Sequence, residues 1–517
     1  MTDTTAGPML AADGRPLKQS LRRALRVQKM RALLLIAPLL LFVLLTFLAP
    51  IADMLFRSVE NEIVRDTLPE TVTLLQEWDA DAGDAPSEAV FRALYVDLFL
   101  AQEYKTHTRL GSRLNYEEAG ISSLFRGTGR RVRRFDTDIY ADQFAGLDAA
   151  WRNGGTWERL FADGAVRSAL PFTARSWDRW ATFLREEEGD VPAEETPEDF
   201  LFATLHDELK AGAPSGLDPL LDQALGAIDG FESVSIRDQF FDADEDWADP
   251  NVWRVIQLYS PTYTSGYFLN SVDLEKTLDG GVAPRDEDEQ IYVVLFERTL
   301  FMSLVITFSC ILLGYPVAWL LANLPMRTAN LLMILVLLPF WTSLLVRTSA
   351  WKVMLQQQGV VNDTMVWLGL VADDGRLIMI NNQFGTIVAM THILLPFMIL
   401  PLYSVMQTIP PTYLRAAKSL GATNLTAFWR VYFPQTVPGI GAGSILVFIL
   451  SIGYYITPEI VGGTQGTFIS NRIAFHISSS LNWGLAAALG TILLGLVLLL
   501  YWVYDRIVGI DNVKLGG

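Results

Sequence analysis

Five side chains near the ends of two apolar stretches have the chemistry to contact a cation. Trp341 and Thr342 lie in one stretch, and Tyr454, Tyr455 and Glu459 lie at the end of another. A carboxylate pairs with a positive charge, and aromatic faces attract one. Such groups are costly in a membrane, so these five are candidate residues of a translocation pathway. A helix-end carboxylate in water explains Glu459 equally well, and interfacial anchoring or helix packing explains the aromatic residues more readily.

The sequence shows no pattern for catalysis or for metal binding. The acidic strings 186–190 and 242–249 lack the alternating oxygens and glycine turn of a calcium loop and are expected to be solvated. No GxxxxGK[ST] phosphate loop is present, and Cys310 is expected to be a small packed side chain. The four histidines, which are scattered without metal-ligand spacing, are His107, His206, His392 and His476. The chain is therefore not expected to be an enzyme, and any ATP must bind to another chain.

Two regions of different character make up the 517 residues. Hydrophobic residues form 51% of the chain, which is high for a soluble domain and enough for several membrane spans. Residues 59–290 hold 47 of the 57 acidic residues but only 21 of the 40 basic residues. An acidic, water-soluble region therefore interrupts an apolar chain.

The N-terminal segment 1–31 is basic, and the apolar run after it predicts a first membrane helix at 32–58. A basic block directly before an apolar run marks the cytoplasmic side of a membrane. A cleaved signal peptide is the alternative, but the run is long for one and Pro50 disrupts the small-residue exit. The basic residues are Arg15, Lys18, Arg22, Arg23, Arg26, Lys29 and Arg31.

Residues 59–290 are predicted to form a mostly helical domain outside the inner membrane. The stretches that begin at Pro86 and Ala174 place apolar residues three and four apart, as amphipathic helices do. A disordered insert is the alternative, but seven tryptophans between 78 and 253 argue against it. The basic cluster 126–134 is a candidate anion or partner site, although a solvated face is the simpler explanation.

Five further apolar runs predict an all-α membrane core at 291–517. They cover 299–324, 330–346 with a continuation to 351, 384–406, 437–458 and 481–504. Six spans return the C-terminus to the side of the N-terminus. Short segments on that side carry 13 basic residues against 4 in the two short opposite loops, so both termini are expected in the cytoplasm.

The cytoplasmic loop 408–436 has the features of a docking helix. Pro410 and Pro411 end the fourth span, and Thr412 is expected to cap a new short helix. Gly421 allows the left-handed turn that ends this helix, and prolines at 434 and 438 mark the return to the membrane. Small and basic residues on an exposed helix indicate a surface that fits a groove of a partner.

The string RAAKSLGATNLTAFWRVYFPQTVPG, from Arg415 to Gly439, resembles the EAA loop of binding-protein-dependent ABC importer permeases. Their pattern is Glu-Ala-Ala, three residues, Gly, nine residues and Ile-x-Leu-Pro. Arg415 stands where that family has Glu, which leaves the helix intact and alters any polar contact of that carboxylate. The residues assigned to ATPase coupling by this resemblance are Leu414, Arg415, Ala416, Ala417, Lys418, Gly421 and Pro434.

Segments 331–351, 391–410 and 453–463 are similar to spermidine/putrescine-type permeases. The resemblance implies the type I importer fold of six transmembrane helices, to which this chain adds a large, mostly helical periplasmic insertion between helices 1 and 2 that has no counterpart in the family, whose typical members have only a short loop there. It implies a multi-pass protein of the bacterial inner membrane that moves a polyamine-like cation. The expected partners are an ATPase dimer that binds ATP and Mg, a second permease, a periplasmic solute-binding protein and lipid, and no nucleic acid.

A membrane sensor or scaffold with an extracytoplasmic binding domain is the alternative that the large insert favours. An exporter or channel is a third and weaker interpretation, because no fused ATPase or pore motif is visible.

Overall fold

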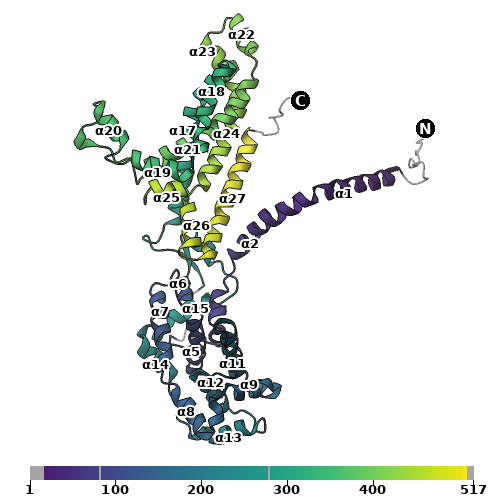
Figure 1. The fold of residues 1–517 in the computed structure, drawn as a ribbon, viewed down its shortest axis with the longest axis vertical. Coiled ribbons are helices and arrows are strands. Elements are labelled where there is room, and N and C mark those ends of the chain that lie inside the picture. The colour runs from purple at the N-terminus through teal and green to yellow at the C-terminus, as the bar shows by residue number, and fades with distance from the viewer. Residues whose placement is uncertain (1–16, 81–82, 278–279, 509–517) are drawn as a thin grey trace.

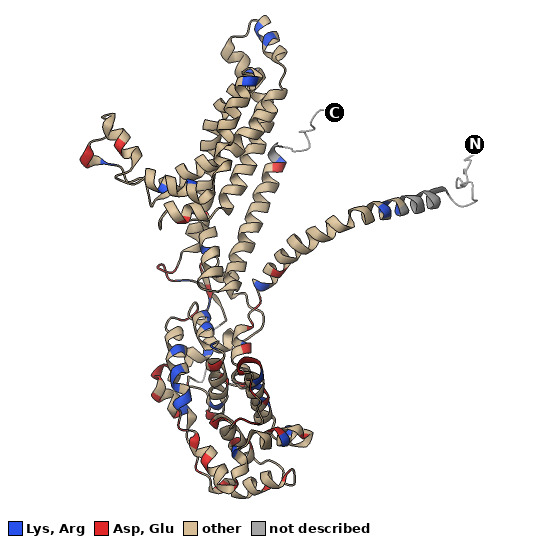
Figure 2. Ribbon diagram, in the orientation of Figure 1, with Lys and Arg blue, Asp and Glu red and all other residues tan. Residues whose placement is uncertain are grey.

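The computed structural model describes residues 17–80, 83–277 and 280–508 (Figure 1). Residues 1–16 of the basic N-terminal segment and the C-terminal residues 509–517 lie outside this range. The chain forms a long bundle of apolar helices and, at one end of it, a separate body of short helices (Figure 1). Charged residues gather in the body of short helices and are sparse along the bundle (Figure 2).

The first helical stretch is nearly continuous and precedes the body of short helices. It consists of α1 (Leu17–Val43), the π turn η1 (Leu44–Leu48) and α2 (Ala49–Arg57). The segment Gln28–Arg57 is long and apolar enough to cross a membrane, and its apolar core is exposed in the isolated chain. It extends away from the other apolar helices, and among the described residues α2 packs on α27, where the Met54 sulfur lies near Gly490 (Figure 1).

The body of short helices, called the helical domain below, covers residues 59–290. Its helices are α3 (Ile63–Thr67), α4 (Pro69–Leu75), α5 (Glu88–Glu103), α6 (His107–Leu114), α7 (Ile121–Arg131), α8 (Asp138–Leu147), α9 (Gly154–Ala162), α10 (Gly164–Ala169), α11 (Pro171–Phe183), α12 (Asp199–Lys210), α13 (Pro219–Ala227), α14 (Ile236–Ala243), α15 (Pro250–Leu258) and α16 (Gly266–Asn270). The antiparallel pair β1 (Leu274–Lys276) and β2 (Val282–Pro284) follows them. One hydrophobic core runs from Val64 to Tyr259.

A repeated local structure supplies much of this core. The stretches 144–157 and 240–253 share the spacing Phe-x3-Asp-x2-Trp-x5-Trp. In each copy the aspartate accepts a backbone N–H at the start of a short 3₁₀ turn, and the second tryptophan donates its indole N–H to the carbonyl of the first, at 2.8 Å and 2.9 Å. All four tryptophans are fully buried, and this bond satisfies the only polar atom of the second tryptophan side chain inside the repeat itself.

The membrane core follows. Its elements are α17 (Tyr292–Asn323), α18 (Met326–Leu337), the 3₁₀ turn η8 (Leu338–Trp341), α19 (Leu344–Met354), α20 (Val360–Trp367), α21 (Gln383–Thr408), α22 (Pro411–Ser419), α23 (Asn424–Ala427), the π turn η10 (Phe428–Tyr432), α24 (Phe433–Gly453), α25 (Ile456–Val461), α26 (Ile469–Ser478) and α27 (Trp483–Val508). Helices α17, α21 and α24 pack closely around one apolar core.

Small residues let these helices approach, as the glycines at the start of the fifth predicted span indicate. A Cβ on Gly443 would lie 2.6 Å from the Met398 sulfur and 3.3 Å from its carbonyl oxygen. Helices in a membrane associate largely through such close van der Waals packing. Gly443 therefore sets the distance between α24 and α21.

Five helices in the described ranges are long and apolar enough to span a membrane, and a sixth span forms if the bent pair α18–α19 counts as one. The third predicted span, 330–346 with a continuation to 351, coincides with this pair, and the pair bends by 94° around η8. Pro339 lies in that turn and cannot continue a regular helix. The fifth predicted span ends earlier than Pro458, because α24 stops at Gly453 and α25 begins after a break.

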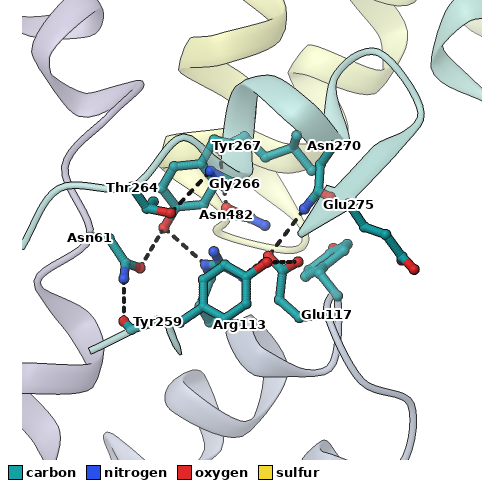
Figure 3. A network of polar contacts seen from close by, with 12 residues as sticks. Asn61, Arg113, Glu117, Tyr259, Thr264, Gly266, Tyr267, Asn270, Glu275 and Asn482 are labelled. Atoms are coloured by element: carbon teal, nitrogen blue, oxygen red, sulfur yellow. Dashed lines mark hydrogen bonds and ion pairs between the residues drawn. The ribbon is translucent and has the colours of Figure 1, made fainter. Parts of the chain in front are cut away.

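The helical domain joins the bundle through a buried polar network (Figure 3). Arg113 and Glu117, each about one-twentieth exposed or less, form an ion pair of 2.6 Å. Tyr259 donates its hydroxyl to Glu117 at 2.7 Å, and Arg113 donates to the Tyr267 hydroxyl at 3.0 Å. Burial, reinforced by the Glu117 charge, raises the pKa of Tyr259 above its ordinary value, so this hydroxyl keeps the proton that it donates.

The same junction reaches two helices of the membrane core. Asp273 accepts the backbone N–H groups of Ile291, Tyr292 and Val293 at 2.7–3.1 Å, which caps the start of α17. The ring of Tyr267 lies against the backbone of Gly484 at the start of α27. The helical domain is thus fastened to both α17 and α27.

Candidate functional site

The loop between α21 and α24 lies at the end of the bundle farthest from the helical domain (Figure 1). It contains α22, α23 and η10, and it carries the residues that the sequence assigned to coupling. Helix α22 begins at Pro411, so the expected capping role of Thr412 is wrong; no side chain caps this helix. Proline suits the first turn because its missing N–H would be unsatisfied there in any case.

A left-handed glycine ends α22 as the sequence predicts. Gly421 has φ of +90°, and the following Ala422 N–H bonds back to the Ala417 carbonyl at 3.1 Å. Thr423 then accepts the backbone N–H of Thr426 at 3.3 Å and starts α23. The two short helices are therefore held by local hydrogen bonds and do not need a partner to form.

The outward surface of the loop carries both basic and apolar side chains. Arg415 and Lys418 are exposed and make no ion pair within the described chain. Leu420 is 90% exposed and Leu425 is 70% exposed, which is unusual for leucines on a solvent-facing loop. Ala416 is exposed and Ala417 half-buried, so neither adds bulk to this surface.

Two of the residues that the sequence assigned to ATPase coupling do not lie on the outward surface of α22 and α23. Leu414 is partly buried against the apolar core of the bundle, so it anchors α22 and does not face outward. Pro434 lies in the first turn of α24. Between them Phe428 packs edge-on against Tyr315 of α17, with 6.2 Å between ring centroids. The loop is therefore fastened to α17 as well as to its own helices.

The five candidate pathway residues lie at two breaks in the membrane helices. Trp341 is 72% exposed at the end of η8, and Thr342 follows it. Tyr454 and Tyr455 occupy the break between α24 and α25, and Glu459 lies on α25. No hydrogen bond or ring contact joins the first pair to the other three residues in the part of the chain described.

Asn471 holds the second break in place. Its amide donates to the Tyr455 carbonyl at 2.9 Å and to the Glu459 carboxylate at 2.5 Å, while its oxygen accepts the Phe468 N–H at 3.0 Å. The other carboxylate oxygen of Glu459 accepts no hydrogen bond from the residues that the structure describes, and Glu459 is exposed in the isolated chain. A carboxylate oriented by one amide can still accept from a cation.

Sequence reasoning missed three residues that lie beside these breaks. Thr348 of α19 meets Thr457 of α25 at 3.1 Å between hydroxyl oxygens. Arg347, next to it, has two buried N–H groups without an acceptor among the described residues. The one available signal for Arg347 was a lone arginine inside an otherwise apolar run.

A bundle of membrane-length helices with an exposed basic and apolar loop at one end is the architecture of a multi-pass membrane protein. Comparison with known proteins identifies the family. Residues 300–508 match the family described as the binding-protein-dependent transport system inner membrane component.

Related proteins with assigned functions are permeases of the same kind. The spermidine/putrescine transport system permease protein PotB of Escherichia coli K12 is 36% identical over 222 residues, which are 42% of this chain and 80% of PotB. The inner membrane ABC transporter permease protein YdcU of the same organism is 32% identical over 241 residues, which are 45% of this chain and 76% of YdcU. This chain belongs to the family of ABC importer permeases, in its spermidine/putrescine-type branch.

The solved structures that match this chain are more distant from it than these relatives. The crystal structure of a bacterial alginate ABC transporter, in complex with an alginate pentasaccharide-bound periplasmic protein, matches at 18% identity and a TM-score of 0.36. The match covers 44% of this chain and 81% of the other. A similarity at this level adds no information about function.

Proposed function

We propose that this permease moves a polyamine-like cation across the inner membrane and is driven by a separate ATPase that docks on the loop 408–436. The observation that carries the proposal is the outward face of α22 and α23, where Arg415, Lys418, Leu420 and Leu425 are exposed together. An isolated loop gains nothing from exposed leucines, whereas a partner groove would bury them.

In this proposal the chain pairs with a second permease and two ATPase subunits, which bind ATP and Mg. Two contacts fasten the loop to the bundle: Leu414 packs on the bundle core and Phe428 packs on α17. The loop and these helices would therefore move together. Closure of the ATPase dimer would move the loop, and with it α17 and α24, between inward-open and outward-open states.

The breaks at Trp341 and at Tyr454–Glu459 are then the places where a solute meets polar groups. Glu459 supplies a carboxylate for a cation, and the exposed rings of Trp341 and Tyr455 supply aromatic faces. In this arrangement the N- and C-termini lie in the cytoplasm and the helical domain lies in the periplasm, where a solute-binding protein docks on it.

The docking assignment is tested with Leu420→Asp. Leu420 is 90% exposed in the free chain, so the fold should be unchanged. The variant should lose about 2 kcal/mol of binding free energy, which burial of the leucine side chain in the partner groove would otherwise supply. We expect more than tenfold weaker co-purification of the ATPase subunit and a matching loss of uptake.

Val191→Asp is the matched control, because it places the same carboxylate at a 53% exposed apolar position of the helical domain. Normal ATPase binding by Leu420→Asp, or an equal loss in Val191→Asp, would contradict the assignment of this loop.

A further inference from the structure

The helical domain contains a cavity that the transport function does not explain. It has a volume of about 380 Å³ and opens between α3, the end of α5 and α11. Its lining includes Asp66, Leu100, Tyr104, Asp178 and Arg179, together with threonine hydroxyls. A cavity of this size holds a small organic molecule.

Two of the three charges in the lining are already neutralised within the domain. Arg179 donates to Asp97 at 2.6 Å, and Asp97 is fully buried and also accepts the backbone and hydroxyl hydrogens of Thr71. Asp178 forms a two-point ion pair with Arg167. Neither group has a full charge to offer to a ligand.

Asp66 is the exception. It is exposed and forms no ion pair within the described residues, so the cavity keeps one uncompensated negative charge. Its position on α3 is fixed by the helix, since its own backbone N–H bonds to the Glu62 carbonyl at 2.8 Å.

Tyr104 adds an aromatic surface at the same opening. Its ring is 38% exposed and packs edge-on against Phe183 at 5.1 Å between centroids, which fixes its plane. Burial first, and then the nearby carboxylates of Glu186 and Glu187, raise the pKa of its hydroxyl, against a smaller opposing effect of the Arg179 charge. The ring therefore stays neutral, which suits attraction of a cation to its face.

We propose that this cavity binds a small organic ion with at least two ammonium groups, one at the Asp66 carboxylate and another near the face of Tyr104. A metal ion fits less well, because the described residues hold no group of three metal-ligating side chains. The proposal requires neither ATPase docking nor transport, so it can fail or succeed independently of the proposed function.

The experiment measures equilibrium binding of radiolabelled spermidine to the purified full-length chain at low and at physiological salt. The background is Glu459→Gln, which weakens any site among the membrane helices. Asp66→Asn should weaken binding by about tenfold, because a charge-assisted contact is lost, and Tyr104→Leu should weaken it by a few-fold. Both changes are at surface-accessible positions, and a thermal unfolding curve checks that each variant is folded.

Asp229→Asn is the matched control, an exposed aspartate near α13 at the far end of the domain with no ion pair among the described residues (Figure 1). Unchanged affinity in this control together with loss in Asp66→Asn supports the cavity. Equal loss in both would mean general attraction to an acidic surface and would overturn the proposal. So would an absence of saturable binding in the background chain, or full binding by both cavity variants.

Discussion

One titratable side chain of the helical domain, the imidazole of His206, is buried as a neutral group. His206 is fully buried between the rings of Tyr140 and Phe231, and its Nε2 has no hydrogen-bond partner among the described residues. Its Nδ1 faces Asp207 at 3.1 Å, but that carboxylate is already paired with Arg92. Burial, with smaller contributions from Lys210 and Arg92, lowers the pKa of His206 to about 4.

The pKa shift of His206 predicts acid sensitivity of the domain. In the unfolded chain the imidazole takes up a proton below about pH 6.5, whereas in the folded chain it does so only below about pH 4. The unfolded state therefore binds more protons in this window, and stability falls as pH falls from about 6.5 to 4. At pH 5 the loss should be about 2 kcal/mol relative to pH 7.5.

His206→Phe should keep the aromatic packing and remove the loss of stability between pH 7.5 and pH 5. Thermal unfolding of the full-length protein at pH 7.5 and pH 5 measures it: the variant should lose less stability on acidification than the parent. The same acid-induced decrease in both proteins would show that His206 is not the group that titrates.

At the scale of elements, the contact between α16 and α27 decides how the helical domain sits on the bundle. A Cβ on Gly484 would lie 2.3 Å from a ring carbon of Tyr267. The Arg113 guanidinium lies over the same ring, 4.4 Å from its centroid, and donates to the Tyr267 hydroxyl, so the ring is held in place. The position therefore requires glycine because of tertiary packing, since its backbone is ordinary helix.

Gly484→Ala is expected to destabilise the junction by about 1–3 kcal/mol, as overpacking of a buried contact does. Limited proteolysis of the segment 59–64, where the domain leaves the first helix, should become faster. Gly495→Ala is the control on the same helix, because a Cβ added there would meet no atom within 4 Å. Because Tyr267→Ala also removes the acceptor of Arg113, it is the reference for a double-mutant cycle: Gly484→Ala should destabilise the Tyr267→Ala protein less than it destabilises the parent, and an equal loss in both would count against the explanation.

At the scale of the whole molecule, the two ends of the segment 62–261, which forms most of the helical domain, lie side by side. Asn61 donates its backbone N–H to Thr262 at 2.7 Å, and Thr264 donates to Val59 at 2.8 Å, so the two chain segments run antiparallel. A domain whose ends meet can be inserted into or removed from a loop without stretching the rest of the chain.

This geometry predicts the result of an excision. Replacing residues 62–261 with Asn-Gly would join Asn61 to Thr262 by a two-residue turn of the kind that connects antiparallel strands. We expect the membrane core to insert and to bind the ATPase subunit as before, while uptake is lost because the solute-binding protein has no docking surface.

Unchanged uptake after excision would make the helical domain accessory. Loss of ATPase binding would instead show that the bundle needs the domain to fold, and a signalling defect without any transport defect would favour the sensor interpretation.

Much of the membrane core could be predicted from local sequence. An apolar run of membrane length forms a helix because no other structure satisfies its backbone in lipid. The helix of the loop 408–436 could likewise be predicted, since Pro411 and Gly421 act through the backbone of their own turn. The bend of the third span was missed, because Pro339 limits a helix while the packing of α19 on α25 sets the direction in which it continues.

The amino-acid sequence by itself therefore determined the family, the apolar helices and the short helix of the exposed loop 408–436, all of which depend on residues near one another in the chain. Only the tertiary structure decided that Asn61 meets Tyr259, that Gly484 supports Tyr267, and that Asp66, Tyr104 and Asp178 share one cavity. The physical reason is the same in each case: these groups are far apart in sequence, and their contacts exist only when many weak interactions of a folded core fix the distance between them.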